Sequence, residues 1–237
     1  MRLLKRRSLL AGSGVYALAT FTGAEAFAAD RRTPPYNDSR YRRILDVAKL
    51  QYPNSGTRIE EGDFQGESVT NRFYLRGSVM TFSSVGSGRR CELRLEYEFR
   101  PNSGTNRIYG RVRPRKPETS SMDQFTFMQL HEYRGDGPVC RMAWRRSRSG
   151  IKDHVWAAVR TRPGRDPEHF DFGPRSSSFQ NFEMRTSGGK LRVRYGSRTR
   201  TFDISDYNSR DLYWKLGAYN QDSGTSVAEF SSARHSR

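Results

Sequence analysis

The stretch 90–99 reads RCELRLEYEF and decides the fold. Every even position, from Arg90 to Glu98, carries a charge, and every odd position, from Cys91 to Phe99, is apolar or cysteine. Because successive side chains of a β-strand point to opposite faces, this period of two predicts a strand with all its charges on one face. Such a face is either the ordinary solvent side of an antiparallel sheet or a polar binding surface.

Similar runs fill the chain from about residue 65 onward. They are rich in Val, Tyr, Phe and Thr and are separated by Gly, Pro, Asn and Ser, which is typical of short strands and turns. We expect strands at 78–84, 90–99, 107–113, 124–133, 140–145, 154–160, 179–185, 190–195, 199–204 and 212–220. A hairpin is expected from Lys190 to Ile204, with its turn near Gly196 and Ser197. The stretch 161–178 is expected to be a loop long enough to overhang a binding groove. About ten strands in one domain predict an all-β, jelly-roll β-sandwich of two antiparallel sheets.

One short helix is expected before the β region. Tyr41, Ile44, Leu45 and Ala48 recur at helical spacing, and Ser39 is a candidate cap for a helix that runs to about residue 50. We therefore divide the chain into an export signal at 1–28, a leader with a short helix at 29–64, and a β-sandwich domain at 65–237.

The first 28 residues have the pattern of a signal peptide. Basic residues lie at positions 2 and 5–7, an apolar stretch follows from Leu9 to Thr20, and Ala26 to Ala28 offers an A-x-A cleavage site. The run Lys5 to Leu10 is similar to a twin-arginine signal without having its full pattern. The apolar stretch is too short for a membrane span of about 20 residues. We expect an exported protein, periplasmic or secreted, with no membrane partner.

Charge predicts an anionic partner. The sequence holds 42 Lys and Arg against 25 Asp and Glu, a net charge of +17. Removing 1–28 takes away four basic residues and one acidic residue, so the mature chain stays strongly basic. Nucleic acid, anionic lipid and acidic polysaccharide all fit such a surface. Export and the lack of a nucleic-acid-binding motif argue against nucleic acid.

Two further strands carry polar residues on one face. In 124–133, alternation places Phe125, Phe127, Gln129, His131 and Tyr133 together, a mixture of aromatic and hydrogen-bonding groups that suits a sugar-binding groove. A lone histidine on a half-exposed strand is the simpler explanation of His131.

The third strand, 213–221, has a glycine between polar residues. Tyr213, Lys215, Gly217, Tyr219 and Gln221 share a face, and Gly217 lets another group approach closely. We interpret this face as the floor of a ligand site; an edge strand with an incidental glycine is the alternative.

These three strands resemble polysaccharide lyase family 7, the alginate lyases. The family carries the strand motifs R-(S/T)-E-L-R, Q-(I/V)-H and Y-F-K-A-G-x-Y-N-Q. Here the matching stretches are RCELR at 90–94, QLH at 129–131 and YWKLGAYNQ at 213–221, in the same order. The stretch 73–82 is similar to the strand pair that precedes the first motif. The departures, at Cys91, Leu130, Trp214 and Leu216, fall by parity on the side away from the groove.

The resemblance implies a concanavalin-like sandwich and a β-elimination that needs no metal or other cofactor. It assigns Arg90, Gln129 and His131 to neutralising the uronate carboxylate, and either His131 or Tyr219 to removing the C5 proton. By the same resemblance, Tyr219 would protonate the leaving oxygen. The residues that would hold neighbouring uronates are Arg94, Lys215 and Gln221, and Glu92 would orient an arginine by a salt bridge.

Several alternatives stay open at this stage. The substrate is expected to be alginate or a related polyuronate, with mannuronate, guluronate and glucuronate all possible. The main rival is a non-catalytic module of the same fold that binds an acidic polysaccharide. Cys91 and Cys140 either form a disulfide, which an oxidising compartment permits, or remain separate buried thiols. We expect a monomer.

Overall fold

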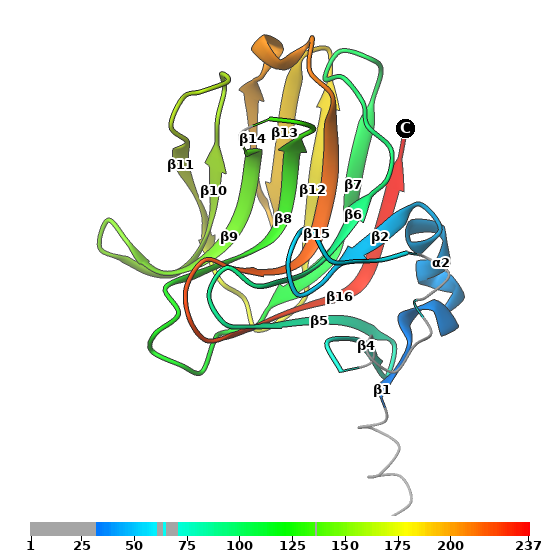
Figure 1. Ribbon diagram of the computed structural model, residues 1–237. Helices are drawn as coiled ribbons and strands as arrows, with labels where there is room; N and C mark the ends of the chain where they lie inside the picture. The colour runs from blue at the N-terminus through cyan, green and yellow to red at the C-terminus, as the bar shows by residue number, and fades with distance from the viewer. Residues whose placement is uncertain (1–31, 61–63, 65–70, 136) are drawn as a thin grey trace, which may run out of the picture.

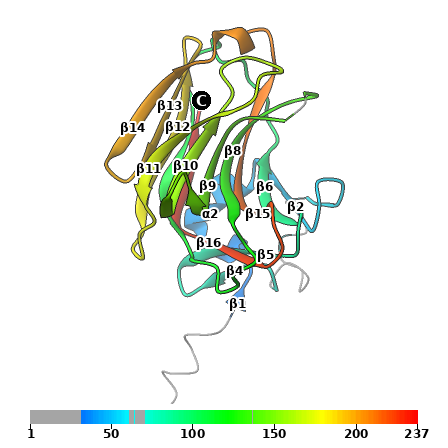
Figure 2. The same ribbon diagram turned by 90° about the vertical axis from the view of Figure 1, so that its left-hand side faces the viewer.

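Two eight-stranded antiparallel sheets pack face to face, which confirms the predicted sandwich. A computed structural model describes residues 32–60, 64, 71–135 and 137–237. The signal peptide expected at 1–28 lies outside these residues. In Figure 1 one sheet lies in front, with β11, β10, β9, β8, β15, β6 and β2 following one another from left to right, and Figure 2 shows the two layers side by side.

We call the sheet that contains the three motif strands the site sheet. In spatial order its strands are β11 (Glu168–Pro174), β10 (Ile151–Val159), β9 (Pro138–Arg148), β8 (Gln124–Glu132), β15 (Leu212–Asn220), β6 (Arg90–Leu95), β2 (Ala48–Gln51) and β3 (Arg58–Ile59).

The other sheet is called the back sheet. Its strands, again in spatial order, are β1 (Arg32–Thr33), β4 (Phe73–Arg76), β5 (Val79–Val85), β16 (Thr225–Ser236), β7 (Asn106–Pro114), β12 (Gln180–Ser187), β13 (Lys190–Tyr195) and β14 (Arg198–Asp203). The expected hairpin from 190 to 204 is confirmed, with Tyr195 paired to Arg198 at its turn.

The core between the sheets is built largely from aromatic side chains. Trp144 and Trp214 of the site sheet are fully buried, and Phe127 reaches across to Tyr195 of the back sheet with ring centroids 6.1 Å apart. Large aromatic rings bury 150–250 Å² each, by rough estimate, so a chain poor in aliphatic residues can still form a stable core.

The N-terminal helix is shorter than expected. Besides the short 3-10 turns η1 (Pro35–Asn37) and η3 (Ser205–Tyr207), the described chain has the α-helix α2 (Ser39–Leu45). Its N-cap is Asp38, whose carboxylate accepts from the Arg40 amide, and not Ser39. In place of the last helical turn, β2 pairs with β6, with Leu50 opposite Leu93. Ala48 and Leu50 are both buried, so the apolar residues of this stretch follow the two-residue period of a strand and not the period of a helix.

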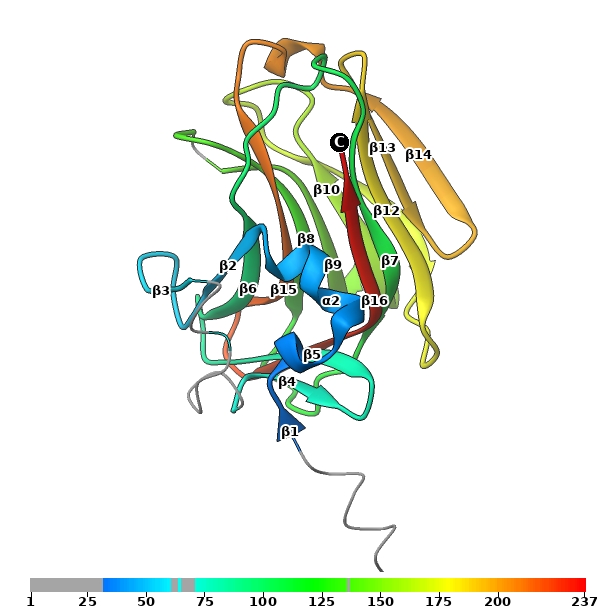
Figure 3. The ribbon, with the colours of Figure 1, turned by 90° about the vertical axis from the view of Figure 1, so that its right-hand side faces the viewer.

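Helix α2 packs against β16 at one end of the sandwich (Figure 3). The Tyr41 hydroxyl lies 2.8 Å from the carbonyl oxygen of Phe230 and 2.9 Å from that of Ser78, and it donates to this pair of acceptors. Residues that we assigned to a leader preceding the domain therefore contribute a helix and strands to both sheets.

Within the expected β region, strands β11 and β16 were missed in the sequence. The predicted loop 161–178 contains β11, which pairs with β10 and widens the site sheet. Strand β16, at 12 residues, lies between β5 and β7 in the back sheet. Its sequence is rich in Ser and Ala and its register shifts between Phe230 and Ser232, so no clean alternation marks it.

No helix in the described part of the chain is long and apolar enough to cross a membrane.

Candidate active site

The three motif strands are neighbours in the site sheet, as the shared chemistry requires. Strand β15 lies between β6 and β8. Lys215 is opposite Arg94 on one side and Gln129 on the other, while Tyr219 is opposite Arg90. We call the side of this sheet that faces away from the core the site face.

A buried carboxylate organises the centre of the site face. Glu92 is inaccessible to solvent. Its Oε1 accepts from Gln129 Nε2 at 2.5 Å, and its Oε2 lies 3.2 Å from Lys215 Nζ and 3.6 Å from Arg90 Nη1. A single carboxylate thus contacts one amide and two cations, more than the one arginine that Glu92 was expected to pair with.

Arg90 lies between this carboxylate and Tyr219. Its guanidinium carbon is 4.2 Å from the centroid of the Tyr219 ring, a cation–π contact. The Arg90 Nε atom is buried without a hydrogen-bond partner in the described structure. This arginine therefore keeps donor capacity for a ligand while its position is fixed from two sides.

His131 is held in one tautomer. Its Nδ1 lies 2.8 Å from the carbonyl oxygen of Glu132, which can only accept, so Nδ1 carries the proton and Nε2 is free to accept. The ring stacks on Tyr213, with centroids 5.2 Å apart and planes 22° apart. Burial lowers the pKa of His131 to about 4, well below the usual histidine value near 6.5.

The residues expected to hold neighbouring uronates differ in accessibility. Lys215 is only 1% exposed and lies beneath the site face, where it binds Glu92, so it supports the site rather than presenting a free ammonium. Arg94 pairs with Glu98 at 2.6 Å and covers the Tyr213 ring at 4.2 Å. Gln221 donates to Thr126 Oγ1 at 3.1 Å, and its own Oε1 is buried without a hydrogen-bond partner among the described residues.

A glycine is required at position 217 by a close contact with the backbone of β6 and not by a ligand. Its φ is +147°, and a Cβ at this position would lie 2.3 Å from the Cys91 carbonyl oxygen and 2.6 Å from the Glu92 Cα. The close approach that we expected from a ligand is made by β6 itself, so this glycine sets the spacing that brings Glu92 to Lys215.

The face predicted for Phe125 and Phe127 in β8 is wrong because the strand contains a bulge. The register against β9 shifts between Thr126 and Met128. Phe125 and Phe127 consequently lie in the core and not beside Gln129, while Thr126 turns to the site face. Simple alternation fails here because the bulge inserts one unpaired residue.

Sequence reasoning missed a set of residues on the same face. Across β9, β10 and β11 the site face continues with Arg141, Arg145, Trp156 and His169. Arg141 is directly opposite Gln129. Alternation along 140–145 could have placed both arginines on one face, but β11 was expected to be a loop.

The two cysteines are free and buried. Cys91 lies on β6 and Cys140 on β9, three strands away in one sheet, which is at least about 14 Å at the usual strand spacing. A disulfide needs Cα atoms within about 7 Å, so the alternative of two separate thiols is correct for this structure. Nor do the described residues contain a cluster of His, Cys, Asp and Glu suited to a metal ion.

The fold and the site face define a β-sandwich protein with a cationic, hydrogen-bonding surface on one sheet. Comparison with known proteins gives the family: the model of the alginate lyase family Alginate_lyase2 matches residues 45–237. The chain belongs to this family, and it is a polysaccharide lyase.

Individual relatives agree. An alginate lyase of Photobacterium sp. (strain ATCC 43367) is 23% identical over 289 residues, covering 98% of each chain. Among solved structures, alginate lyase AlyC3 aligns with a TM-score of 0.78 at 20% identity, covering 92% of this chain and 98% of that one. Alginate lyase A1-II', a member of polysaccharide lyase family 7, aligns with a TM-score of 0.70 at 22% identity, covering 86% and 98%.

Proposed function

We propose that this lyase cleaves an alginate-type polyuronate by β-elimination at the site face of β6, β15 and β8. The observation that carries the proposal is the arrangement around Glu92, where Arg90 and Gln129 are fixed next to Tyr219 and His131. The likeness to AlyC3, solved with dimannuronate, and to A1-II', solved with the substrate GGMG, supports a uronate ligand.

The reaction must first make the C5 proton of the uronate removable. The adjacent carboxylate is negative, and neutralising it makes an enolate-like state accessible. Arg90 supplies the positive charge and Gln129 an amide donor, both held in place before the substrate arrives by Glu92. Preorganised donors at developing charge are commonly the largest single contribution to catalysis.

Tyr219 is the better proton-transfer group of the two candidates. Because burial lowers the pKa of His131 to about 4, its neutral ring is a weak base. In the proposed step the Tyr219 phenolate takes the C5 proton. The C4–O bond then breaks, a C4=C5 double bond forms, and the Tyr219 phenol returns the proton to the leaving oxygen, so no water is consumed.

The experiment mixes purified protein with polymannuronate, polyguluronate and glucuronan in separate cuvettes. Ultraviolet absorbance of the C4=C5 double bond is followed for the wild type, for Tyr219→Phe and for a control, Tyr109→Phe, on the outer face of the back sheet. We expect a rise with at least one polymer, reduced by about 10²–10⁴-fold in Tyr219→Phe and unchanged in the control.

The alternative, a non-catalytic binding module, gives another result in the same assay. It shows no absorbance rise with any polymer but salt-sensitive binding to one of them. A polymer-selective rise also identifies which uronate is preferred.

Export is proposed on the N-terminal sequence alone. We infer that 1–28 is removed during export, which sequencing the N-terminus of the periplasmic or secreted protein tests. A mature chain beginning at Ala29 is expected.

A further inference from the structure

The outer face of the back sheet carries three arginines in one cross-strand row. Arg107 of β7 is opposite Arg185 of β12, and Arg185 is opposite Arg192 of β13. We call these three residues the arginine row. Figure 3 shows β7, β12 and β13 together on the right-hand side, away from β6 and β15 of the site sheet.

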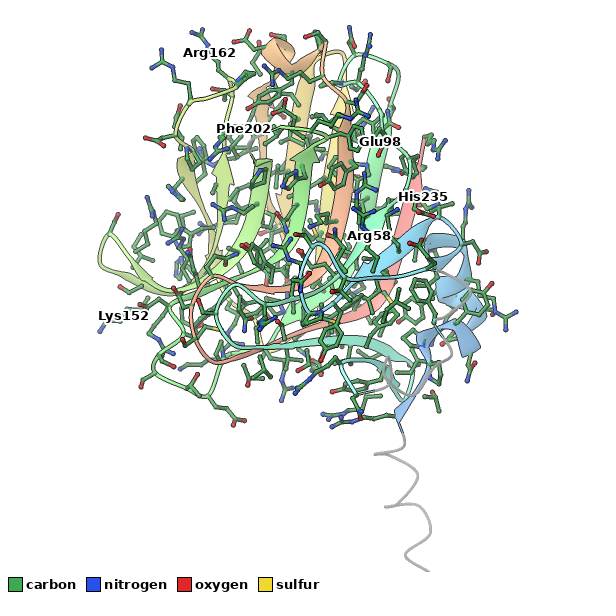
Figure 4. All side chains as sticks on the ribbon, in the orientation of Figure 1. Arg58, Glu98, Lys152, Arg162, Phe202 and His235 are labelled. Atoms are coloured by element: carbon green, nitrogen blue, oxygen red, sulfur yellow. The ribbon has the colours of Figure 1, made fainter. Side chains whose placement is uncertain are left out.

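The arginine row points away from the core. The chain neighbours of its members, Ile108, Met184 and Leu191, are fully buried. Because successive side chains of a strand point to opposite faces, the arginines point outward, on the side of the sandwich opposite to the site face. Figure 4 labels Phe202 of β14 and His235 of β16, and the arginine row lies on the three strands between these two.

This arrangement of charges is unfavourable in the free protein. Neighbouring strands lie about 4.8 Å apart, and like charges directly opposite each other destabilise a sheet. The row has one acidic partner, Glu183, whose Oε1 lies 2.9 Å from Arg192 Nη1 and whose Oε2 lies 3.9 Å from Arg107 Nη1. One carboxylate therefore serves the two outer arginines of the row.

The central arginine has no partner of its own. In the part of the chain that the structure describes, Arg185 makes neither an ion pair nor a side-chain hydrogen bond, and its Nε is buried without an acceptor. Arg107, by contrast, donates from Nε to Ser236 Oγ at 2.9 Å. A buried donor without an acceptor costs free energy, so Arg185 is the member of the row that gains most from an anionic ligand.

The surface around the row has the same character. Arg234 of β16 is exposed and forms no ion pair with any described residue. The row ends in hydroxyl groups on both sides, with Ser236 opposite Arg107 and Thr201 opposite Arg192. A cationic strip with hydrogen-bonding ends thus crosses the sheet from β16 to β14.

The geometry of the strip fits an extended polymer of carboxylates. A guanidinium group binds a carboxylate through two parallel hydrogen bonds. The row repeats this group at the strand spacing of about 4.8 Å, which is similar to the repeat of an extended polysaccharide. A single small anion would satisfy one arginine, whereas a polyuronate chain lying across the strands satisfies the whole row.

We propose that the arginine row is a second, non-catalytic binding site for a polyuronate chain, on the face opposite to the site face. The inference rests on the proposed function for the identity of the polymer. A protein molecule with binding sites on both faces stays attached to the polymer while the site face releases one segment and takes up another.

The test measures polymer binding without cleavage. In a Tyr219→Phe background, calorimetry with polymannuronate, polyguluronate and glucuronan compares Arg185→Gln, the pair Arg107→Gln and Arg192→Gln, and the control Arg43→Gln. Arg43 is an exposed arginine of α2 that belongs to neither sheet, so its replacement removes one charge away from both faces.

For the polymer that binds most tightly, we expect Kd to rise by about fivefold in Arg185→Gln, as one exposed charged contact contributes, and further in the pair. The dependence of Kd on salt should weaken in the same variants, because fewer charges are screened. The control should keep the Kd of its parent. A Kd that is unchanged in both Arg185→Gln and the pair would overturn the inference.

Thermal unfolding separates binding from a structural role. Arg185→Gln relieves repulsion within the row, so its Tm should equal or exceed that of the wild type. A lower Tm together with an unchanged Kd would mean that Arg185 serves the fold, and would reject the site.

Two further outcomes distinguish this inference from the proposed function. Binding that depends on the arginine row, in a protein whose wild type is inactive on all three polymers, rejects the proposed function and supports the row as a polyuronate site. An active wild type whose polymer binding ignores the row rejects the row alone. If the row variants lose affinity for a DNA duplex but not for any polyuronate, the row is a nucleic-acid site and the inference is wrong.

Discussion

Glu92 and Lys215 form an ion pair between neighbouring strands in which neither residue is accessible to solvent: Oε2 and Nζ are 3.2 Å apart, and the residues are 0% and 1% exposed. A buried ion pair of this kind adds little stability compared with apolar residues of similar size. Removing one of its members strongly destabilises the fold, because the other charge is left buried without a partner. Its value in this protein lies in position, since the same carboxylate also holds Gln129 and Arg90.

Replacing Glu92 with Gln should therefore destabilise the fold strongly. We expect a loss of about 3–5 kcal/mol in the free energy of unfolding, because the Lys215 ammonium stays buried and unpaired. Urea denaturation measures it. The control Glu96→Gln removes a more exposed partner of Lys49, 2.8 Å away, and should cost less than about 1 kcal/mol.

The double variant Glu92→Gln, Lys215→Met separates structure from chemistry. Removing both charges should restore much of the stability while lyase activity stays low, because Arg90 and Gln129 lose their common anchor. Recovery of activity together with stability would contradict the positioning role of Glu92.

Gly217→Ala should be more harmful than an ordinary glycine substitution. The new Cβ would meet the backbone of β6 at 2.3 Å, and backbone atoms cannot move aside as a flexible side chain can. We expect a loss of about 1–3 kcal/mol beyond that of Gly88→Ala, where φ is also positive but nothing lies within 4 Å. Thermal and urea unfolding of the two variants provide the comparison, and equal losses would show that β6 can adapt.

The buried histidines should make stability depend on pH on the acidic side. The pKa values of His131 and His169 are about 4 in the folded protein, against about 6.5 when unfolded. Between these values the unfolded state binds more protons, so this contribution to stability is complete above about pH 6.5 and is lost as the pH falls towards 4.

Measuring the free energy of unfolding from pH 4 to 7 tests this dependence. Each histidine contributes a slope of at most about 1.4 kcal/mol per pH unit. The variant His131→Gln, His169→Gln should show a shallower dependence across this window. A slope identical to that of the wild type would mean that other groups dominate the acid limb.

Reducing agents should not change the thermal stability. Cys91 and Cys140 are separate buried thiols, so no bond is available to reduce. We expect the same Tm with and without reductant, and no reaction with a thiol reagent until the protein unfolds, when two thiols per chain become reactive. A lower Tm under reducing conditions would point to a disulfide between chains or to a different pairing.

The regular strands were predictable because their side chains alternate without interruption. The charges of Arg90, Glu92 and Arg94 fell on one face, and so did Tyr213, Lys215 and Tyr219, as local geometry alone requires. Alternation failed in β8, where a bulge at Phe127 moved two aromatic residues into the core. The strand β16 escaped notice because pairing on both sides, and not its own composition, makes it a strand.

By itself the sequence determined the β-sandwich class, the three motif strands and the residues that we propose for the chemistry, because side-chain alternation and residue type are local properties of the chain. Only the tertiary structure decided that β15 lies between β6 and β8, that Lys215 is buried under the site face, and that Arg141, Arg145 and His169 continue that face. Strand order, burial and the pairing of charges depend on contacts between residues far apart in the chain, and such contacts leave no periodic signal in the sequence.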